Sequence, residues 1–390
     1  MSINGFSNFR GFQRSDGSVG IRNHIAIIST VACANHVVNS IAQGYPNAVP
    51  ITHQHGCDQL GKDLDLFFNT LLGIAKNGNV AAVLVVGLGC EEISAFNLAK
   101  AIAKTGKPAS SLIIQEVGGT PASILEGKKR LNFLCSSLTL KEEDIDFSKL
   151  IVGLKCGGSD FSSGIITNST VGEVVDVLLQ KGAKVVFGET TELLGAEEVI
   201  RQKAQSSKIK TFILGKIHKV EESAILMRMD IRGAQPSPGN IEGGLSTIEE
   251  KSLGAVCKIG NSKINNVLNF AQPCYKPGLS FMDTPGNDIL TMVGLAAGGA
   301  HIIIFTTGRG TPMGFATVPV IKVCASPKTV HVMKENIDVD ISPFFFGKIS
   351  LSEAGRIVFN SVIETARGKL TKAEILGHRE FGIHRIGPTL

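Results

Sequence analysis

Short apolar runs that end abruptly in glycine-containing polar motifs constrain the fold of this chain most. Residues 80–86 are nearly all apolar and lead directly into Gly-Leu-Gly-Cys-Glu at 87–91. Similar runs at 150–154 and 184–187 lead into polar motifs at 155–160 and 189–192. A strand that is covered on both faces has such a continuous apolar run. The pattern predicts parallel strands whose carboxyl ends carry the functional residues, because loops leaving those ends line the crevice of an open α/β sheet.

Helical patterns alternate with these strands. They predict helices at 60–76 and 94–104, and a strand follows at 111–114. The charged residues 141–144 interrupt the alternation and are expected to form an exposed connection, after which it restarts at 150. We therefore expect an α/β fold of two doubly wound, mainly parallel-sheet regions with a Gly-rich C-terminal segment. The expected division is an N-terminal α/β domain at 1–145 and a C-terminal α/β catalytic region at 146–390.

The turn-rich stretch from 236 to 244 contains several Pro and Gly residues. Long loops of this kind are usually either functional or disordered. We favour a functional loop, because further polar motifs follow it closely at 251–254 and 282–286.

The composition argues against several classes of protein. The chain has 390 residues and a formal net charge of +5 with scattered Lys and Arg, which favours a small anionic substrate over nucleic acid. No apolar run reaches the roughly 18 residues of a membrane span, and residues 1–10 lack the pattern of a signal peptide. The eight cysteines show no disulfide-rich spacing, which favours reduced thiols and a cytoplasmic protein.

Three cysteines lie beside glycine at expected strand ends: Cys57, Cys90 and Cys156. Thiolates suit soft or borderline metals, and ligands from separate strands suit an open catalytic metal. The alternative is that a cysteine is a small buried apolar residue, which we favour for the other five. Glu91 is a further candidate ligand, although it could equally cap a helix. We expect Cys57, Cys90 and Cys156 to meet Glu189 around one cleft.

Four residues are candidates for proton transfer: His53, Lys155, Asp160 and Glu189. Histidines and carboxylates at strand ends can act as general acids or bases. Capping of helices is the alternative for the two carboxylates, but each lies beside glycine in an expected turn. The cations Arg22, Lys251 and Arg309 lie in or beside turns and could hold a carboxylate, although a solvated surface position is about as consistent with the pattern.

The ordered motifs resemble the UxaA family, which includes altronate dehydratase and galactarate dehydratase. The resemblance runs from about residue 11 to the C-terminus. Within the matching motifs, the candidates for substrate binding are extended to Asn23, Gln115, Ser159 and Ser252. The matching stretches are 16–23, 53–57, 87–91, 115–120, 154–160, 189–192, 238–240, 243–244, 250–254, 282–286 and 305–310.

The resemblance implies a lyase assisted by Fe(II) or Mn(II). Altronate-type members remove water from a sugar acid such as altronate or galactarate and yield a 2-keto-3-deoxy acid. A base takes the proton α to the carboxylate and an acid helps the C3 group to leave. Our candidates are His53 or Lys155 for proton transfer and Arg22 or Lys251 for the substrate carboxylate. Related two-subunit members remove sulfite from sulfolactate, which is the alternative reaction.

Two further readings stay open. Three thiolates could hold an Fe–S cluster in place of a single metal ion, and the chain could be an inactive scaffold that binds sugar acids. Sugar-acid dehydratases of the family also carry a small N-terminal domain of the SAF type. No segment before residue 11 resembles it, so we expect a separate SAF-type small subunit, and a homo-oligomer as well. No nucleic acid or membrane partner is expected.

Overall fold

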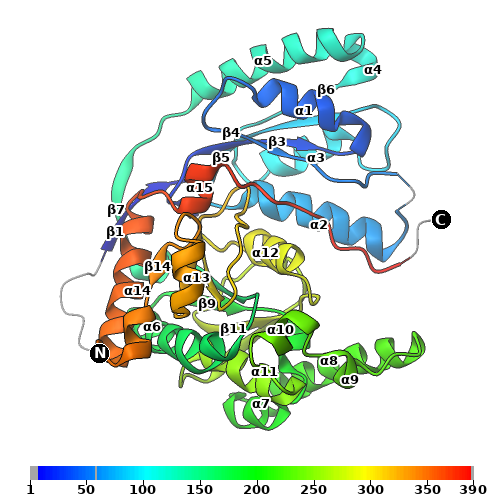
Figure 1. Cartoon of the computed structure of the whole chain (residues 1–390). Coiled ribbons are helices and arrows are strands. Elements are labelled where there is room, and N and C mark those ends of the chain that lie inside the picture. The colour runs from blue at the N-terminus through cyan, green and yellow to red at the C-terminus, as the bar shows by residue number, and fades with distance from the viewer. Residues whose placement is uncertain (1–7, 58, 388–390) are drawn as a thin grey trace.

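The computed structural model describes residues 8–57 and 59–387, which form two α/β units around three sheets (Figure 1). The N-terminal unit contains a four-stranded sheet in the order β4-β3-β5-β6, and the C-terminal unit a seven-stranded sheet in the order β10-β11-β9-β8-β12-β13-β14. Every strand pair in these two sheets is parallel. The expected α/β fold with mainly parallel sheets is thereby confirmed.

The N-terminal sheet is covered on both faces. It consists of β3 (His24–Ser29), β4 (Ala48–Ile51), β5 (Val80–Gly87) and β6 (Ala109–Ile113). One face packs against α1 (Asn35–Ala42) and α5 (Thr120–Ser137), and the other against α2 (Lys62–Lys76) and α3 (Ala95–Ala103). All residues of β5 are buried, as its continuous apolar run predicts.

The C-terminal sheet is also covered by helices on both faces. On one face, α6 (Asn168–Gln180), α8 (Ser207–Leu226) and α14 (Leu351–Ala366) contribute to a large apolar core. On the other, α12 (Asp288–Ala297) packs against α2 of the N-terminal unit. The two units therefore share one apolar core. The strands are β8 (Ile151–Cys156), β9 (Lys184–Phe187), β10 (Ile264–Leu268), β11 (Gly278–Met282), β12 (Ile302–Thr307), β13 (Val320–Cys324) and β14 (Val339–Asp340).

The expected exposed connection at 141–144 is instead part of a strand, β7 (Glu142–Asp146). It pairs antiparallel with β1 (Asn8–Gln13), which also pairs with β2 (Val19–Gly20). Its charged side chains stay exposed while Ile145 enters the core. The high charge of this segment led to the prediction of a connection without a strand. Backbone pairing and one buried apolar residue are enough to form an edge strand.

The turn-rich stretch from 236 to 244 contains a short helix, α10 (Pro238–Glu242), which begins at a capping box formed by Ser237 and Asn240. In the described part of the chain, no helix is long and apolar enough to cross a bilayer. The remaining helices are short: α4 (Ile114–Val117), α7 (Glu197–Lys203), α9 (Ile231–Ala234), α11 (Ile248–Val256), α13 (Pro327–Val332) and α15 (Lys372–Leu376).

Candidate active site

A polar cavity of about 560 Å³ opens at the carboxyl edge of the C-terminal sheet. This edge contains a switch point of the sheet topology, because strands are added on both sides of β8: β9 lies on one side and β12 on the other. Ligands of open α/β sheets bind at such switch points. A smaller lobe of about 310 Å³ shares Glu189, Glu192, Gln235 and Lys251 with the main cavity. The main cavity is lined by Cys156, Gly157, Gly158, Ser159, Glu189, Glu192, Gln235, Ser237, Gly239, Asn240, Lys251, Gly286, Asn287, Asp288, Arg309 and Gly310.

A buried ammonium group lies beside this cavity. Lys155, near the end of β8, is 1% exposed. Its Nζ forms an ion pair with the Glu189 carboxylate and another with Asp288 Oδ1 at 2.7 Å. Glu189 follows β9, and Asp288 begins α12 after β11. Neighbouring parallel strands thus bring a cation and two carboxylates to one point.

The backbone of Glu189 is held in an unusual conformation. Its φ is +68°, in the left-handed region that residues other than glycine rarely adopt. The Glu189 amide donates to the Thr284 hydroxyl, and the Thr190 amide donates to the Thr284 carbonyl at 3.0 Å. Such a conformation costs on the order of 1–3 kcal/mol and persists where the surroundings fix it, often at functional sites.

The electrostatics of the cluster favour an uncharged carboxyl at neutral pH. Burial raises the pKa of Glu189 to about 7; Lys155 opposes the shift, while the neighbouring carboxylates of Glu192 and Asp288 reinforce it. Burial alone would lower the pKa of Lys155, but the surrounding carboxylates outweigh burial and raise it above its usual range. Lys155 therefore stays charged, and Glu189 can exchange a proton near neutral pH.

A second buried ion pair joins Glu192 to Lys258. Both side chains are at most 4% exposed. The cluster holds three carboxylates, Glu189, Glu192 and Asp288, against two ammonium groups. The excess of carboxylates adds to the effect of burial, which is the main reason that the pKa of Glu189 is raised.

Cys156 ends β8 and lines the cavity although it is 2% exposed. Its Sγ lies 3.4 Å from Ser159 Oγ and accepts from Asn168 Nδ2 at 3.6 Å. The Ser159 carbonyl accepts from Asn240 Nδ2 at 2.9 Å, which ties the loop after β8 to α10. The thiol is thus positioned by hydrogen bonds on the cavity wall.

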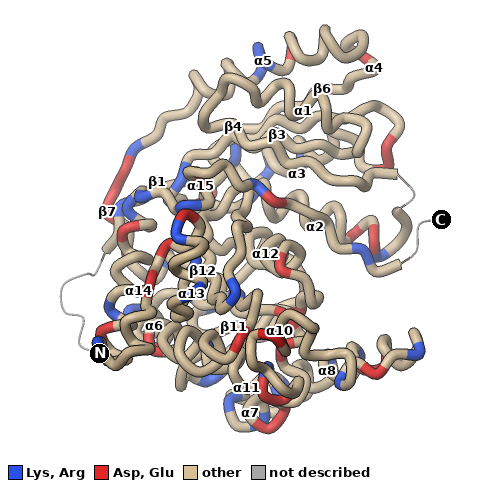
Figure 2. The backbone as a smooth tube through the Cα atoms, in the orientation of Figure 1, with Lys and Arg blue, Asp and Glu red and all other residues tan. Residues whose placement is uncertain are grey.

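The rim of the cavity carries two of the predicted substrate-binding cations. Lys251 Nζ donates to Gln235 Oε1 at 2.9 Å, and Arg309 forms an ion pair with Glu242 at 2.8 Å. Figure 2 shows several Asp and Glu positions along α7, α10 and α11. The Ser252 hydroxyl, in the wall of the smaller lobe, is buried without a hydrogen-bond partner among the described residues. It is therefore available to a ligand.

Asp160 is placed as a structural cap. Its Oδ1 accepts from the Ser163 amide and the Ser162 hydroxyl, both at 2.8 Å. It also packs against Gly308, where a Cβ would lie 1.8 Å from Asp160 Oδ1. Asp160 does not line the cavity that Glu189 lines.

The other predicted ligands belong to the N-terminal sheet. The loop of Cys57 lies beside that of Cys90, because the Glu92 amide donates to the Gly56 carbonyl at 3.4 Å. Glu91 accepts from the Thr30 hydroxyl at 2.7 Å and from the Gly89 amide at 2.6 Å. Neither Cys57 nor Cys90 lines the cavity of Cys156 and Glu189. The expected convergence on one cleft is thus found for Cys156 and Glu189 alone.

Three more predicted residues lie in the N-terminal unit. His53 is 4% exposed, its Nε2 lies 2.8 Å from the Ser29 carbonyl, and burial lowers its pKa to about 4. Gln115 lies on α4, next to Gly89. The Asn23 side-chain oxygen is buried with no partner in the described part of the chain. None of the three lines the cavity at Glu189.

Arg22 is 8% exposed and fully engaged by the protein. Its guanidinium group pairs with both carboxylate oxygens of Glu374, at 2.7 and 3.0 Å. It also donates to the carbonyls of Ile21, Thr365 and Lys369. This arrangement leaves it no donor for a substrate carboxylate.

The predicted metal ligands Cys57, Cys90, Cys156 and Glu91 do not form a complete set. Among residues 8–57 and 59–387, no three His, Cys, Asp or Glu side chains converge to hold a metal ion. Beside the cavity, the carboxylates of Glu189, Glu192 and Asp288 form ion pairs with ammonium groups instead. The structure therefore does not bring the predicted metal ligands together among the described residues.

Several residues at the site were not predicted from the sequence: Asp288, Asn240 and Gln235 line the cavity, and Lys258 and Asn168 contact residues that line it. Asp288 follows the Asp-Thr-Pro-Gly motif that ends at 286, so extending that motif by two residues would have found it. Nothing in the sequence around Lys258 marks it as the partner of Glu192.

Two family models match nearly the whole chain. The model described as "D-galactarate/Altronate dehydratase, C-terminal" matches residues 147–389. A second, "D-galactarate dehydratase/Altronate hydrolase, second domain", matches residues 11–139. The two matches coincide with the two α/β units.

Curated relatives agree with these models. The "(2R)-sulfolactate sulfo-lyase subunit beta" of Chromohalobacter salexigens is 38% identical and is matched over 97% of both chains. Altronate dehydratase of Bacillus subtilis is 32% identical over 98% of this chain and 78% of its own length. Galactarate dehydratase (L-threo-forming) of Escherichia coli is 31% identical over 93% of this chain and 73% of its own. The chain therefore belongs to the D-galactarate/altronate dehydratase family and is an enzyme of this family of lyases, whose dehydratases are hydro-lyases.

Proposed function

We propose that the chain eliminates the C3 substituent of a small 2-hydroxy carboxylate and yields a 2-keto acid. The dehydratase and sulfo-lyase relatives are named for different leaving groups, water and sulfite. Both reactions begin with removal of the C2 proton. A single cavity with one base and one buried cation accommodates either reaction.

Glu189 is the proposed base. Its carboxyl group lines the cavity and has a pKa near 7, which suits proton transfer at neutral pH. It takes the C2 proton, the electron pair of that bond forms the C2–C3 double bond, and the C3 substituent leaves with the electrons of its own bond. A hydroxyl needs a proton to leave as water, whereas a sulfonate leaves as sulfite. The enol that remains gains a proton at C3 and becomes the 2-keto acid.

Lys155 is proposed to stabilise the charge that develops on the substrate. Loss of the C2 proton places additional negative charge next to the substrate carboxylate. A fixed cation that is 1% exposed acts strongly on such charge, because little water screens it. Lys251, Arg309 and Ser252 line the cavity or its smaller lobe, and we propose that they hold the polar ends of the substrate.

The observation that carries the proposal is the buried cluster of Lys155, Glu189 and Asp288 at the switch point of the sheet. It supplies a base that lines the polar cavity and titrates near neutrality, and a buried cation directly behind that base. We propose sulfite as the leaving group, because the sulfo-lyase subunit is 38% identical to this chain, whereas the two dehydratases named above are 32% and 31% identical.

The test is an anaerobic assay of the purified chain with (2R)-sulfolactate, altronate and galactarate. Formation of a 2-keto acid is measured together with release of sulfite. Glu189→Gln should abolish turnover, whereas Glu222→Gln, on the exposed face of α8, should not. If none of these substrates yields a 2-keto acid with the chain alone or with the small subunit described below, or if Glu189→Gln stays fully active, the proposal fails.

A partner polypeptide is part of the proposal. The sulfo-lyase relative is named as one subunit of an enzyme. Here an apolar groove of about 590 Å³ adjoins the cavity through Arg309 and is lined by Phe161, Val332, Met333 and Phe345. A small subunit of the predicted SAF type could cover these exposed side chains. Activity that appears only when the small subunit is added would support this assignment.

Metal dependence stays a prediction. If Fe(II) or Mn(II) assists the reaction, it would neutralise charge on the substrate carboxylate and hydroxyl. Metal analysis and a visible spectrum of anaerobically purified protein distinguish a single ion from an Fe–S cluster. Protein without bound metal that turns over fully in chelator would contradict both.

A further inference from the structure

A second cavity, of about 540 Å³, lies at the junction of the two units. It is built around the amino ends of the strands: Ile151 begins β8, and Lys184 begins β9. Cys156, in the active-site cavity, ends β8. A strand of this length puts the two cavities roughly 16 Å apart on opposite edges of the sheet. The second cavity is therefore distinct from the proposed active site.

Three lysines from separate elements line this cavity: Lys76 at the end of α2, Lys149 before β8, and Lys184 at the start of β9. None of them forms an ion pair within the described ranges 8–57 and 59–387. One carboxylate, Asp16, belongs to the lining, and its Oδ1 accepts from the Ser18 amide at 2.9 Å. The cavity thus carries an excess of positive charge.

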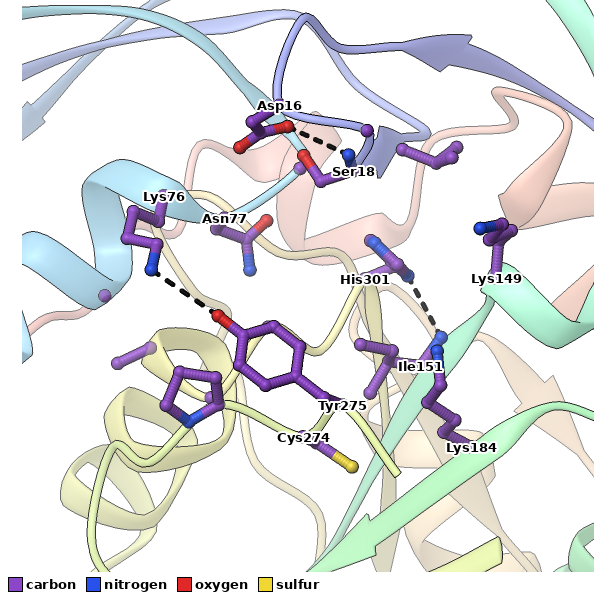
Figure 3. Close-up of a pocket in the computed structure, with 18 of the residues that line it drawn as sticks. Asp16, Ser18, Lys76, Asn77, Lys149, Ile151, Lys184, Cys274, Tyr275 and His301 are labelled. Atoms are coloured by element: carbon purple, nitrogen blue, oxygen red, sulfur yellow. Dashed lines mark hydrogen bonds between the residues drawn. The ribbon is translucent and has the colours of Figure 1, made fainter. Parts of the chain in front are cut away.

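The lysines lie at two ends of the cavity (Figure 3). Lys149 and Lys184 are on one side, and Lys76 is on the other beside Tyr275, whose hydroxyl accepts from Lys76 Nζ at 3.5 Å. Burial lowers the pKa of Lys184, and the nearby charge of Lys149 lowers it further. Two like charges with no intervening anion make this end favourable for a negatively charged group.

His301 does not add a cation at neutral pH. It is 4% exposed, its Nδ1 accepts from the Ile151 amide at 3.0 Å, and burial lowers its pKa to about 4. The Ser18 hydroxyl in the cavity wall is buried without a partner among the described residues. It is a second indication that the wall can bind a polar ligand.

The cavity wall is fixed by contacts between the two units. Asn77 Nδ2 donates to the carbonyls of Ala296 and Ala300 at 2.8 and 2.9 Å, and Asn79 Nδ2 donates to the His301 carbonyl at 3.0 Å. Apolar surface between the lysines comes from Val19, Ile151, Pro273 and Ala297. A ligand that fits has charged ends and an aliphatic middle.

We propose that this cavity binds a small organic dianion, of the dicarboxylate class. One carboxylate contacts Lys149 and Lys184, and the other contacts Lys76. The ligand touches both units, so its binding stabilises their arrangement, and the stabilisation grows with ligand concentration relative to Kd. The site is independent of the reaction proposed above.

The test measures dicarboxylate binding by isothermal titration calorimetry. All measurements use the full chain with Lys251→Met and Arg309→Met. These changes remove the cations at the mouth of the active site, so that binding there does not contribute to the signal. The probes are malonate, succinate, glutarate and adipate, with acetate as the monocarboxylate. We expect affinity to peak at one chain length, and to fall at least about tenfold when Lys149→Met and Lys184→Met are added, as for the loss of charge-assisted contacts.

A matched control removes two exposed lysines of α8, Lys208 and Lys219, and should leave the affinity unchanged. If Lys184→Met does not fold, judged by circular dichroism, Lys149→Met with Lys76→Met tests the same end groups. Equal affinity in the lysine variants, equal binding of acetate, or no binding of any dicarboxylate would overturn the proposal. None of these outcomes depends on turnover, so failure here is distinguishable from failure of the proposed function.

Discussion

The ammonium group of Lys155 lies 2.7 Å from the carboxylate of Asp288, which lines the cavity at the carboxyl edge of the sheet. Asp288 is the first residue of α12, where the positive end of the helix stabilises its negative charge. Lys155 is thus held by the carboxylates of Asp288 and Glu189. Changes at this pair should affect both stability and turnover.

Lys155→Met should abolish turnover and destabilise the protein. Removing one partner of a buried ion pair leaves uncompensated charge and costs about 3–5 kcal/mol of unfolding free energy. Urea unfolding and an elimination assay measure the two effects. Lys208→Met is the matched control on the exposed face of α8. A variant that unfolds at lower urea yet turns over normally would show that Lys155 is structural.

Turnover should rise with pH through about 7 as Glu189 loses its proton, because a general base acts in its deprotonated form. Glu189→Gln should remove this limb together with about 10²- to 10⁴-fold of the rate. A pH profile of kcat/KM measures both. A profile that stays flat from pH 5 to 8 in the wild-type chain would contradict the assignment.

Gly157→Ala should impair the site without unfolding the chain. A Cβ at Gly157 would lie 2.7 Å from Asp288 Oδ2 and 2.6 Å from Phe305 Cζ, so the carboxylate must move. A displacement of about 1 Å can cost about 10²-fold in rate. Gly215→Ala, in α8 with nothing within 4 Å, is the control and should be slightly more stable. Unchanged kcat in Gly157→Ala would argue against a role for Asp288.

Cys156→Ala should greatly reduce turnover while the melting temperature changes little. The thiol lines the cavity, and the small void left by its removal costs little. Cys324→Ala is the matched control, because Cys324 is also buried and burial raises its pKa to about 12. The two variants should have similar melting temperatures, and only Cys156→Ala should lose turnover. Equal activity would place Cys156 among the packing residues.

Acid should destabilise the fold partly through His301. Its pKa is lowered by burial from 6.5 to about 4, so its contribution to stability is present above pH 6.5 and is lost as pH falls toward 4. The contribution is on the order of 3 kcal/mol over that range. Urea unfolding at several pH values measures it, and His301→Gln should show a shallower dependence. The same slope in both proteins would contradict the prediction.

The strand ends were predictable because continuous apolar runs identify buried strands. Lys155 and Glu189 follow neighbouring strands, so their proximity follows from the pattern. The order of strands is not readable from that pattern. Asp288 is close to Lys155 because β11 pairs with β9, and Cys57 and Cys90 are elsewhere because their strands belong to the other sheet. Arg22 was predicted to bind the substrate, because its partner, Glu374, lies too far away in the sequence to be recognised there.

The contact between Arg22 and Glu374 bears on how the protein can be divided. The segment after α14 returns to the N-terminal unit: Arg379 donates to the Ala48 carbonyl at 3.2 Å, and the Ile386 amide donates to Asp63 at 2.6 Å. If the gene were divided near residue 146, the first fragment would therefore contain the Arg22 guanidinium group without its partner carboxylate, Glu374. The two halves are expected to behave as complementary fragments that fold together, rather than as modules to be exchanged between relatives.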